Sequence, residues 1–222
     1  MALSPEDQKP RAYINGEVEF YDLHLKVSQA CLIPRLESEL LVERALKRFP
    51  HQGVILDLCT GSGALGLAIK GQRPSLKVVL ADISKEALAL ASENAKINSL
   101  SVDIFCGDFF KAVSGMKFDG IICNPPYITK DEYELLQKSV KDYEPKIALT
   151  DDGDGLTFYR RLALEACSFL HEGAYLCLEI GKDQGSAVFA LFSDEIWMNK
   201  KIEKDYSSHD RFFFLEKRVR GR

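Results

Sequence analysis

Apolar and polar residues form alternating blocks along most of this chain, and the blocks have the lengths of strands and helices. The short, mostly apolar runs are 54–58, 77–81, 102–106, 118–123 and 175–180. Apolar residues at helical spacing occupy 64–70, 85–98, 156–170 and 185–192, between or after those runs. Short apolar runs are typical of strands buried on both faces. The alternation therefore predicts an α/β fold with parallel strands and right-handed helical connections.

Other segments depart from this pattern. Residues 18–27 alternate between apolar and polar positions, which is typical of a small hairpin. Residues 37–49 have helical spacing, and Pro50 ends that helix. Two strands, at 196–204 and 211–217, are expected to pair antiparallel at an edge. We thus predict a mostly parallel seven-stranded sheet with an antiparallel C-terminal edge and an N-terminal β-hairpin.

The segment 124–154 is polar and too long for an ordinary connector. It follows the run 118–123 and contains a predicted acidic helix near 131–141. Ligands of open α/β folds bind beyond the carboxyl ends of the strands. We therefore expect this segment to be a lid or substrate loop.

The chain has an ordinary composition, which predicts one main domain. Of its 222 residues 46% are hydrophobic and 28% are charged, and the formal net charge is −4. This acidic balance provides no general field to attract nucleic acid. We divide the chain into a polar N-terminal segment at 1–12, a hairpin and helix at 13–50, and the main domain at 51–222.

The cysteines and histidines suggest no metal site. The 6 cysteines lie far apart and mostly within apolar runs, and the 4 histidines form no ligand pair at helical spacing. Reduced thiols in a cytoplasmic protein are the expected state. No apolar run approaches the ~20 residues of a membrane span, and the first residues do not resemble a signal peptide. We expect no metal, a cytoplasmic location and no membrane partner.

A glycine-rich turn follows the run 54–58 and opens the helix at 64–70. Its residues are Asp57, Leu58, Cys59, Thr60, Gly61, Ser62 and Gly63. Glycine in such a turn lets a ligand approach backbone N–H groups closely. Asp82 ends the next strand, where a carboxylate can accept hydrogen bonds from both hydroxyls of a ribose. Together these features predict a cofactor that contains a nucleoside.

Dinucleotide dehydrogenases share the glycine-rich turn and the acid at the position of Asp82. A third feature is therefore needed to distinguish them from other nucleoside-binding enzymes. Dehydrogenases usually have glycine at the position of Cys59. Here Asp108 ends a third strand, where it can accept from an adenine amino group while Phe109 lies against the ring. Acids at the ends of three successive strands are typical of S-adenosylmethionine-dependent methyltransferases. The alternative is that Asp57 and Asp108 only cap the turns that follow them.

Asn124, Pro125, Pro126 and Tyr127 directly follow the run 118–123, at the carboxyl edge of the sheet. A planar amide or amine delocalises its lone pair, which must turn out of the plane before the nitrogen can accept a methyl group. The Asn124 side chain and the Pro125 carbonyl can each accept one N–H of an NH₂ group, and two prolines stiffen the loop. Tyr127 offers a flat apolar face. We predict that these four residues form the catalytic and substrate-binding loop; the alternative is a tight turn that happens to contain two prolines.

Over almost its whole length the chain resembles the release factor glutamine methyltransferases. The similar segments, with the family pattern in parentheses, are 32–39 (LIPRPETE), 57–63 (DLGTGSG), 124–127 (NPPY), 143–149 ((F/Y)EPxxAL), 154–160 (DGLxFYR) and 178–184 (LEIGxxQ). The resemblance implies a Rossmann-like class I fold, a methyltransferase domain at 51–222 and S-adenosyl-L-methionine as cofactor. The implied reaction is methylation of N5 of the glutamine in the GGQ motif of class 1 peptide chain release factors.

Individual roles follow from the same resemblance. Asn124 to Tyr127 hold the substrate glutamine, and Arg35 and Glu37 border the pocket. The residues expected to contact the cofactor are Asp57, Cys59, Thr60, Gly61, Ser62, Gly63, Asp82, Asp108, Phe109 and Asn124. Class 1 release factors are then the partners, and nucleic acid is met only indirectly, through the ribosome.

The chain departs from the family pattern at several positions. Leu36 replaces a proline, Ser38 a threonine and Cys59 a glycine, and Asp151-Asp152 stands where a glycine pair is common. Members usually have a small helical domain ahead of the hairpin, where this chain has only 1–12. We expect either a trimmed form or a short member whose partner docks on the catalytic domain alone.

Two other functions stay open at this point. A DNA adenine or RNA amine methyltransferase would use a similar loop, although the acidic balance and the lack of a recognition domain argue against it. An inactive methyltransferase fold could serve as a binding partner, although all three acids and Asn124 are present. Binding of S-adenosylmethionine would separate the enzyme from the inactive fold.

Overall fold

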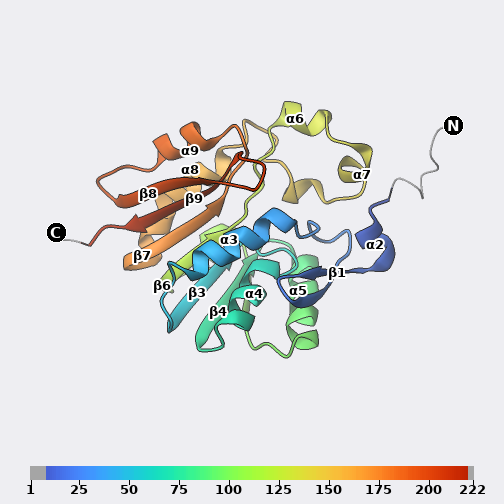
Figure 1. The fold of residues 1–222 in the computed structure, drawn as a ribbon, viewed down its shortest axis with the longest axis horizontal. Coiled ribbons are helices and arrows are strands. Elements are labelled where there is room, and N and C mark those ends of the chain that lie inside the picture. The colour runs from blue at the N-terminus through green and yellow to red at the C-terminus, as the bar shows by residue number, and fades with distance from the viewer. Residues whose placement is uncertain (1–8, 220–222) are drawn as a thin grey trace.

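The computed structural model describes residues 9–219, and its centre is a seven-stranded sheet (Figure 1). The strands are β3 (Gly53–Leu58), β4 (Leu76–Asp82), β5 (Asp103–Cys106), β6 (Phe118–Cys123), β7 (Leu170–Glu179), β8 (Trp197–Lys204) and β9 (Asp210–Lys217). They lie in the order β5-β4-β3-β6-β7-β9-β8. Only β9 runs antiparallel to its neighbours, β7 and β8. The predicted mostly parallel sheet with an antiparallel C-terminal edge is confirmed.

The order of the strands reverses at β3. From β3 the chain continues to β4 and β5 on one side, and it then returns to β6 on the other side. Asp57 of β3 lies beside Leu80 of β4 and Ile122 of β6. Ligands of open α/β sheets bind at such a switch point. The turns that follow β3 and β6 therefore leave the sheet side by side.

Helices cover both faces of the sheet. The helices are α2 (Arg11–Asn15), α3 (Leu36–Leu46), α4 (Ala64–Gln72), α5 (Lys85–Ile97), α6 (Lys130–Glu134), α7 (Lys138–Lys141), α8 (Thr157–Glu165) and α9 (Gly185–Leu191), with 3₁₀ turns η1 (Phe109–Val113), η2 (Lys146–Ala148) and η3 (Ala166–Ser168). One cluster of buried side chains joins Leu41 of α3 to Ile55 of β3. A second cluster joins Leu162 of α8 to Leu56 of β3. Neighbouring residues of β3 thus pack into the two cores on opposite faces of the sheet. Both faces of the strand are buried, which explains why its residues are mostly apolar.

The predicted N-terminal hairpin is present and is bound to the main domain. Strands β1 (Glu17–Phe20) and β2 (Leu23–Lys26) pair antiparallel. Its two turn residues, Tyr21 and Asp22, have φ of 48° and 65°, as a two-residue hairpin turn requires. Asn94 of α5 accepts a hydrogen bond from the Lys26 N–H at 2.7 Å and donates one to the Ser62 carbonyl at 2.9 Å. Asn94 therefore links the hairpin to the glycine-rich turn.

The long segment after β6 differs from its prediction. Instead of one helix at 131–141, the structure has the two short helices α6 and α7, which lie beside each other away from the sheet (Figure 1). Thr129 begins α6 with a capping box that includes Glu132. Leu135, which follows α6, is 85% exposed, so no apolar stripe continues through this region. A longer helix would lack tertiary packing, which supplies most helix stability.

Two other boundaries also differ. The helix predicted at 156–170 ends at Glu165 and continues as η3, and β7 begins at Leu170. Of the polar segment at 1–12, residues 1–8 lie outside the described part, and α2 begins at Arg11 without having been predicted. Within residues 9–219, no helix combines the length and the apolar character that a membrane span requires.

Candidate active site

A cavity of about 220 Å³ lies where β3, β4, β5 and β6 end. The predicted site residues that line it are Arg35, Cys59, Thr60, Gly61, Ser62, Asp82, Asp108, Phe109, Asn124 and Pro126. The predicted site residues outside its lining are Glu37, Asp57, Gly63, Pro125 and Tyr127. The structure thus gathers most of the expected residues around one space, and the others lie behind it or on the surface.

Asp57 is buried and holds the glycine-rich turn in shape. Its Oδ2 accepts hydrogen bonds from Thr60 Oγ1 at 2.6 Å and from the Gly66 N–H at 2.8 Å. Gly61 and Gly63 have φ of 55° and 87°, in the left-handed region that favours glycine. A Cβ on Gly66 would lie 2.3 Å from Leu80 Cδ2, so α4 approaches the sheet as closely as it can.

The second carboxylate oxygen of Asp57, Oδ1, is buried behind the cavity lining. Within residues 9–219, no hydrogen-bond donor reaches Oδ1, although the atom is buried. Burial raises the pKa of the Asp57 carboxyl to about 7, against the opposing effect of the bonds from Thr60 and Gly66. A buried acceptor without a partner is unfavourable. The turn therefore fits a ligand with a donor group, such as the amino group of S-adenosylmethionine.

Asp82 faces the cavity with both oxygens oriented. Its Oδ2 accepts from the Gly61 N–H and its Oδ1 from the Ser84 N–H, each at 2.9 Å. Each carboxylate oxygen can accept a further hydrogen bond. Asp82 is therefore fixed in an orientation that suits the two hydroxyls of a ribose.

Asp108 has a partner that the sequence did not reveal. Arg161 of α8 donates from Nη1 to Asp108 Oδ1 at 2.7 Å, and Lys111 Nζ lies 3.2 Å from Oδ2. These bonds, that of Arg161 first, lower the pKa of the Asp108 carboxyl. The Arg161 guanidinium also lies 4.4 Å from the centroid of the Phe109 ring. A carboxylate accepts up to about four hydrogen bonds, so an adenine amino group can still bind beside Arg161.

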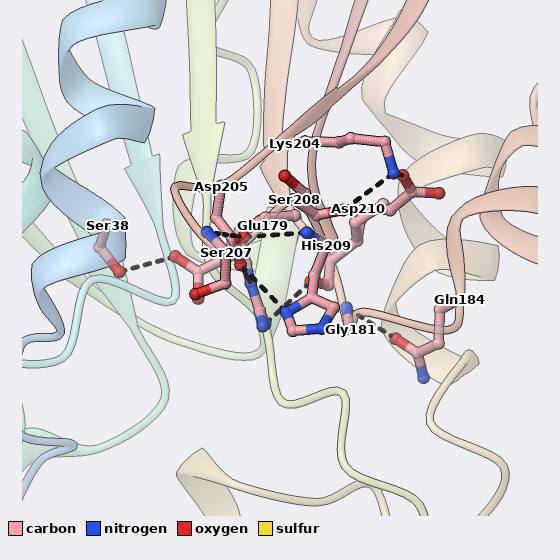
Figure 2. A network of polar contacts seen from close by, with 12 residues as sticks. Ser38, Glu179, Gly181, Gln184, Lys204, Asp205, Ser207, Ser208, His209 and Asp210 are labelled. Atoms are coloured by element: carbon pink, nitrogen blue, oxygen red, sulfur yellow. Dashed lines mark hydrogen bonds and ion pairs between the residues drawn. The ribbon is translucent and has the colours of Figure 1, made fainter.

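The loop after β6 presents Asn124 to the cavity. Among the described residues the Asn124 side chain has no hydrogen-bond partner, so its amide is free to bind a ligand. The loop itself is held from behind. Gln184 Nε2 donates to the Tyr127 carbonyl at 2.8 Å, and Gln184 Oε1 accepts from the Gly181 N–H at 3.1 Å. Figure 2 shows Gln184 next to Gly181 in this arrangement.

Arg35 reaches the cavity, whereas Glu37 does not. Arg35 Nη2 donates to Glu144 Oε1, and Glu144 Oε2 accepts from the Ile33 N–H at 3.1 Å. Glu144 is 5% exposed and joins the segment before α3 to the long segment 124–154. Glu37 lies exposed on α3, outside the lining. Of the two residues expected at the border of the pocket, Arg35 lines the cavity and Glu37 does not, and the carboxylate that binds Arg35 is Glu144.

The aspartates that replace a glycine pair have separate roles. Asp151 accepts hydrogen bonds from the N–H groups of Gly153, Gly155 and Thr157 at 2.9, 3.0 and 3.0 Å, which supports the turn before α8. Asp152 has a φ of 57°, a conformation that glycine adopts without strain. Its carboxylate forms an exposed ion pair with Lys146 at 2.5 Å.

The sequence is similar to a known protein family and to several curated proteins. The methyltransferase small domain family matches residues 36–170. The chain is 40% identical to the release factor glutamine methyltransferase of Fusobacterium nucleatum, over 100% of this chain and 64% of that protein. It is also 40% identical to that of Chlamydia trachomatis serovar D, over 95% of this chain and 73% of that protein. The chain thus spans just under two thirds of the first relative and about three quarters of the second.

Solved structures share the fold. A methyltransferase from Pyrococcus furiosus has a TM-score of 0.68 and 18% identity, covering 89% of this chain and 90% of that one. The 16S rRNA N2 G1207 methyltransferase of Thermus thermophilus, solved with AdoMet and guanosine, has a TM-score of 0.61 and 17% identity, covering 91% of this chain and 50% of that one. At these identities, the two structures show that the chain shares the class I methyltransferase fold and nothing more specific. With its sheet order and its 38% to 40% identity to curated members, this chain belongs to the release factor glutamine methyltransferase family.

Proposed function

We propose that this chain transfers a methyl group from S-adenosylmethionine to N5 of the glutamine in the GGQ motif of class 1 release factors. The observation that carries the proposal is the amide of Asn124, which has no partner among residues 9–219 and faces the same cavity as Asp82 and Asp108. The relatives named for this reaction are about 40% identical to the chain. Because release factors act in translation, the proposal places the enzyme in the cytoplasm.

The residues around the cavity suit each part of the cofactor. Asp82 would hold the ribose, Asp108 and Phe109 the adenine, and Asp57 with the glycine-rich turn the amino-acid end. When bound, S-adenosylmethionine supplies an electrophilic methyl group on a sulfonium. In the proposed division of the chain, 51–222 carries the transfer site, and 13–50 contributes Arg35 to its rim.

The substrate amide needs orientation more than deprotonation. The Asn124 side-chain oxygen and the Pro125 carbonyl would each accept one N–H of the glutamine side chain, which directs the nitrogen lone pair at the methyl carbon. Held in this way, the nitrogen would accept the methyl group, the cofactor would be left as a neutral thioether, and one N–H proton would pass to solvent. Fixed acceptors need little reorganisation during this step. Alignment of the two reacting atoms adds the advantage of proximity.

Mass spectrometry after incubation with isotopically labelled cofactor tests the substrate. A class 1 release factor, DNA and RNA are offered separately, and a factor whose GGQ glutamine is replaced by alanine serves as control. The proposal predicts one methyl group on the GGQ glutamine and none on the control or on the nucleic acids. Label on nucleic acid alone would contradict it.

A further inference from the structure

Glu179 is a buried carboxylate that none of the steps above uses. It is the last residue of β7, and it is 2% exposed. Its Oε2 accepts a hydrogen bond from Ser38 Oγ at 2.6 Å, and Figure 2 shows Ser38 reaching it from α3. Its Oε1 accepts from the Tyr127 hydroxyl at 3.3 Å. An apolar side chain would suit this buried strand end better, because a buried charge is expensive unless it is well paired.

Arg211 of β9 completes the surroundings of the Tyr127 hydroxyl. Its Nη1 donates to the Tyr127 hydroxyl and to the Ile180 carbonyl, each at 3.3 Å, and its Nε donates to Asp205 Oδ2 at 3.4 Å. Burial first, and then the charge of Glu179, raises the pKa of Tyr127, so this hydroxyl remains a donor. The hydroxyl is thus held between one carboxylate and one guanidinium.

These contacts join two walls of the cavity. Ser38 lines the cavity from α3, and Tyr127 belongs to the loop that presents Asn124. Glu179 is the group that both hydroxyls reach, so it sets the spacing between the helix and the loop. The replacement of the family's threonine by Ser38 keeps the hydroxyl on which this link depends.

We propose that Glu179 is a positioning residue for methyl transfer, acting through Ser38 and Tyr127 to hold α3 and the Asn124 loop at a fixed spacing. This inference rests on the proposed function, because the loop would hold the acceptor nitrogen. A displacement of about 1 Å at a reacting centre can slow a reaction about a hundredfold. A fixed position of the Asn124 loop would therefore speed the transfer step itself.

The test compares four variants in single-turnover methyl transfer, together with cofactor binding by calorimetry. Glu179→Gln keeps the shape of the side chain, but one acceptor oxygen becomes a donor, so it cannot accept from both hydroxyls. Tyr127→Phe removes the hydroxyl and keeps the ring, and the third variant combines both changes. Tyr159→Phe is the matched control, because within residues 9–219 the Tyr159 hydroxyl donates to the Glu179 backbone carbonyl alone, at 2.8 Å.

We expect Glu179→Gln to slow transfer about ten- to a hundredfold, with unchanged affinity for S-adenosylmethionine. In the Tyr127→Phe background the same change should add little, because the two residues act as one unit. Tyr159→Phe should lower thermal stability and leave the transfer rate unchanged. If Glu179→Gln unfolds the protein, Ser38→Ala removes one of the two donors and should slow transfer with cofactor affinity retained.

Other results would count against the positioning role of Glu179 or against the proposed function. Wild-type transfer rates in Glu179→Gln, fully additive losses in the combined variant, or an equal loss of rate in Tyr159→Phe would each overturn the inference. If the wild type methylates only nucleic acid and Glu179→Gln slows that reaction, the proposed function falls and the positioning role stands. If the wild type methylates nothing, both fall.

Discussion

The backbone N–H of Gly61 donates a hydrogen bond to Asp82 Oδ2 at 2.9 Å, which joins the turn after β3 to the end of β4. The two strands are neighbours, with Leu58 beside Ala81 at their carboxyl ends. This hydrogen bond fixes the glycine-rich turn and the Asp82 carboxylate relative to each other. A ligand that contacts both would therefore bind to groups that are already in place. The Asp82 side chain therefore supports the turn, and in the proposed function it would also accept hydrogen bonds from the ribose of the cofactor.

Replacement of Asp82 by alanine should weaken binding of S-adenosylmethionine. Hydrogen bonds to a charged group contribute about 1.5–3 kcal/mol each, so the Kd should rise at least about tenfold. Isothermal titration measures this directly. Asp103→Ala is a suitable control, because Asp103 is an exposed carboxylate at the start of the neighbouring strand β5, outside the cavity. Equal affinity in the Asp82 and Asp103 variants would reject the ribose assignment.

Two glycines of α4 should respond oppositely to alanine. At Gly66 an added Cβ would lie 2.3 Å from Leu80 Cδ2 and 3.0 Å from Asp57 Cβ, and such overpacking costs about 1–3 kcal/mol. At Gly71 the nearest atom lies 3.7 Å away, an ordinary contact, and alanine favours a helix by up to about 1 kcal/mol. Urea unfolding should therefore show Gly66→Ala less stable than the parent and Gly71→Ala equally or more stable. Similar destabilisation of both would contradict the close packing of α4 at Gly66.

The buried carboxyl of Asp57 should make stability depend on pH. Its pKa is raised from 3.8 to about 7 by burial, so between these values the folded chain keeps a proton that the unfolded chain has lost. The contribution of Asp57 to stability therefore falls as pH rises from about 4 to about 7, by at most about 1.4 kcal/mol per pH unit, and is constant above pH 7.

Asp57→Asn cannot lose a proton and isolates this effect. The unfolding free energy of the wild type minus that of Asp57→Asn should decline across this pH range and then level off. Other titrating groups cancel in the difference, because both proteins contain them. A difference that stays constant from pH 4 to 7 would show that Asp57 is already ionised in the folded chain.

The centre of the main sheet could be predicted because β3, β4 and β6 are mostly buried. The run 118–123 coincides with β6, since every residue there is fully or partly buried. The long segment 124–154 could not be predicted in the same way. Its short helices depend on local caps, such as Thr129 on α6, rather than on an apolar stripe. Sequence periodicity is informative only where packing against a core imposes it.

Some residues of the candidate site could also be predicted from the sequence, whereas others could not. Asp57, Asp82 and Asn124 were predictable, because parallel strands bring their carboxyl ends to one edge of the sheet. The partners behind them were not. Arg161 lies 53 positions from Asp108, and Ser38 lies 141 positions from Glu179. A single polar residue on a helix or strand carries no local signal of a partner at such separations.

The proposed reaction depends most on Asn124 as an acceptor for the substrate amide. Single-turnover transfer of labelled methyl to a class 1 release factor, measured for wild type, Asn124→Ala and the Gly71→Ala control, tests this directly. We predict a rate constant for Asn124→Ala that is lower by roughly 10²- to 10³-fold, as for the loss of one preorganised hydrogen-bonding group, with the fold intact. The control should retain the wild-type rate. Transfer by Asn124→Ala at the wild-type rate would contradict the account.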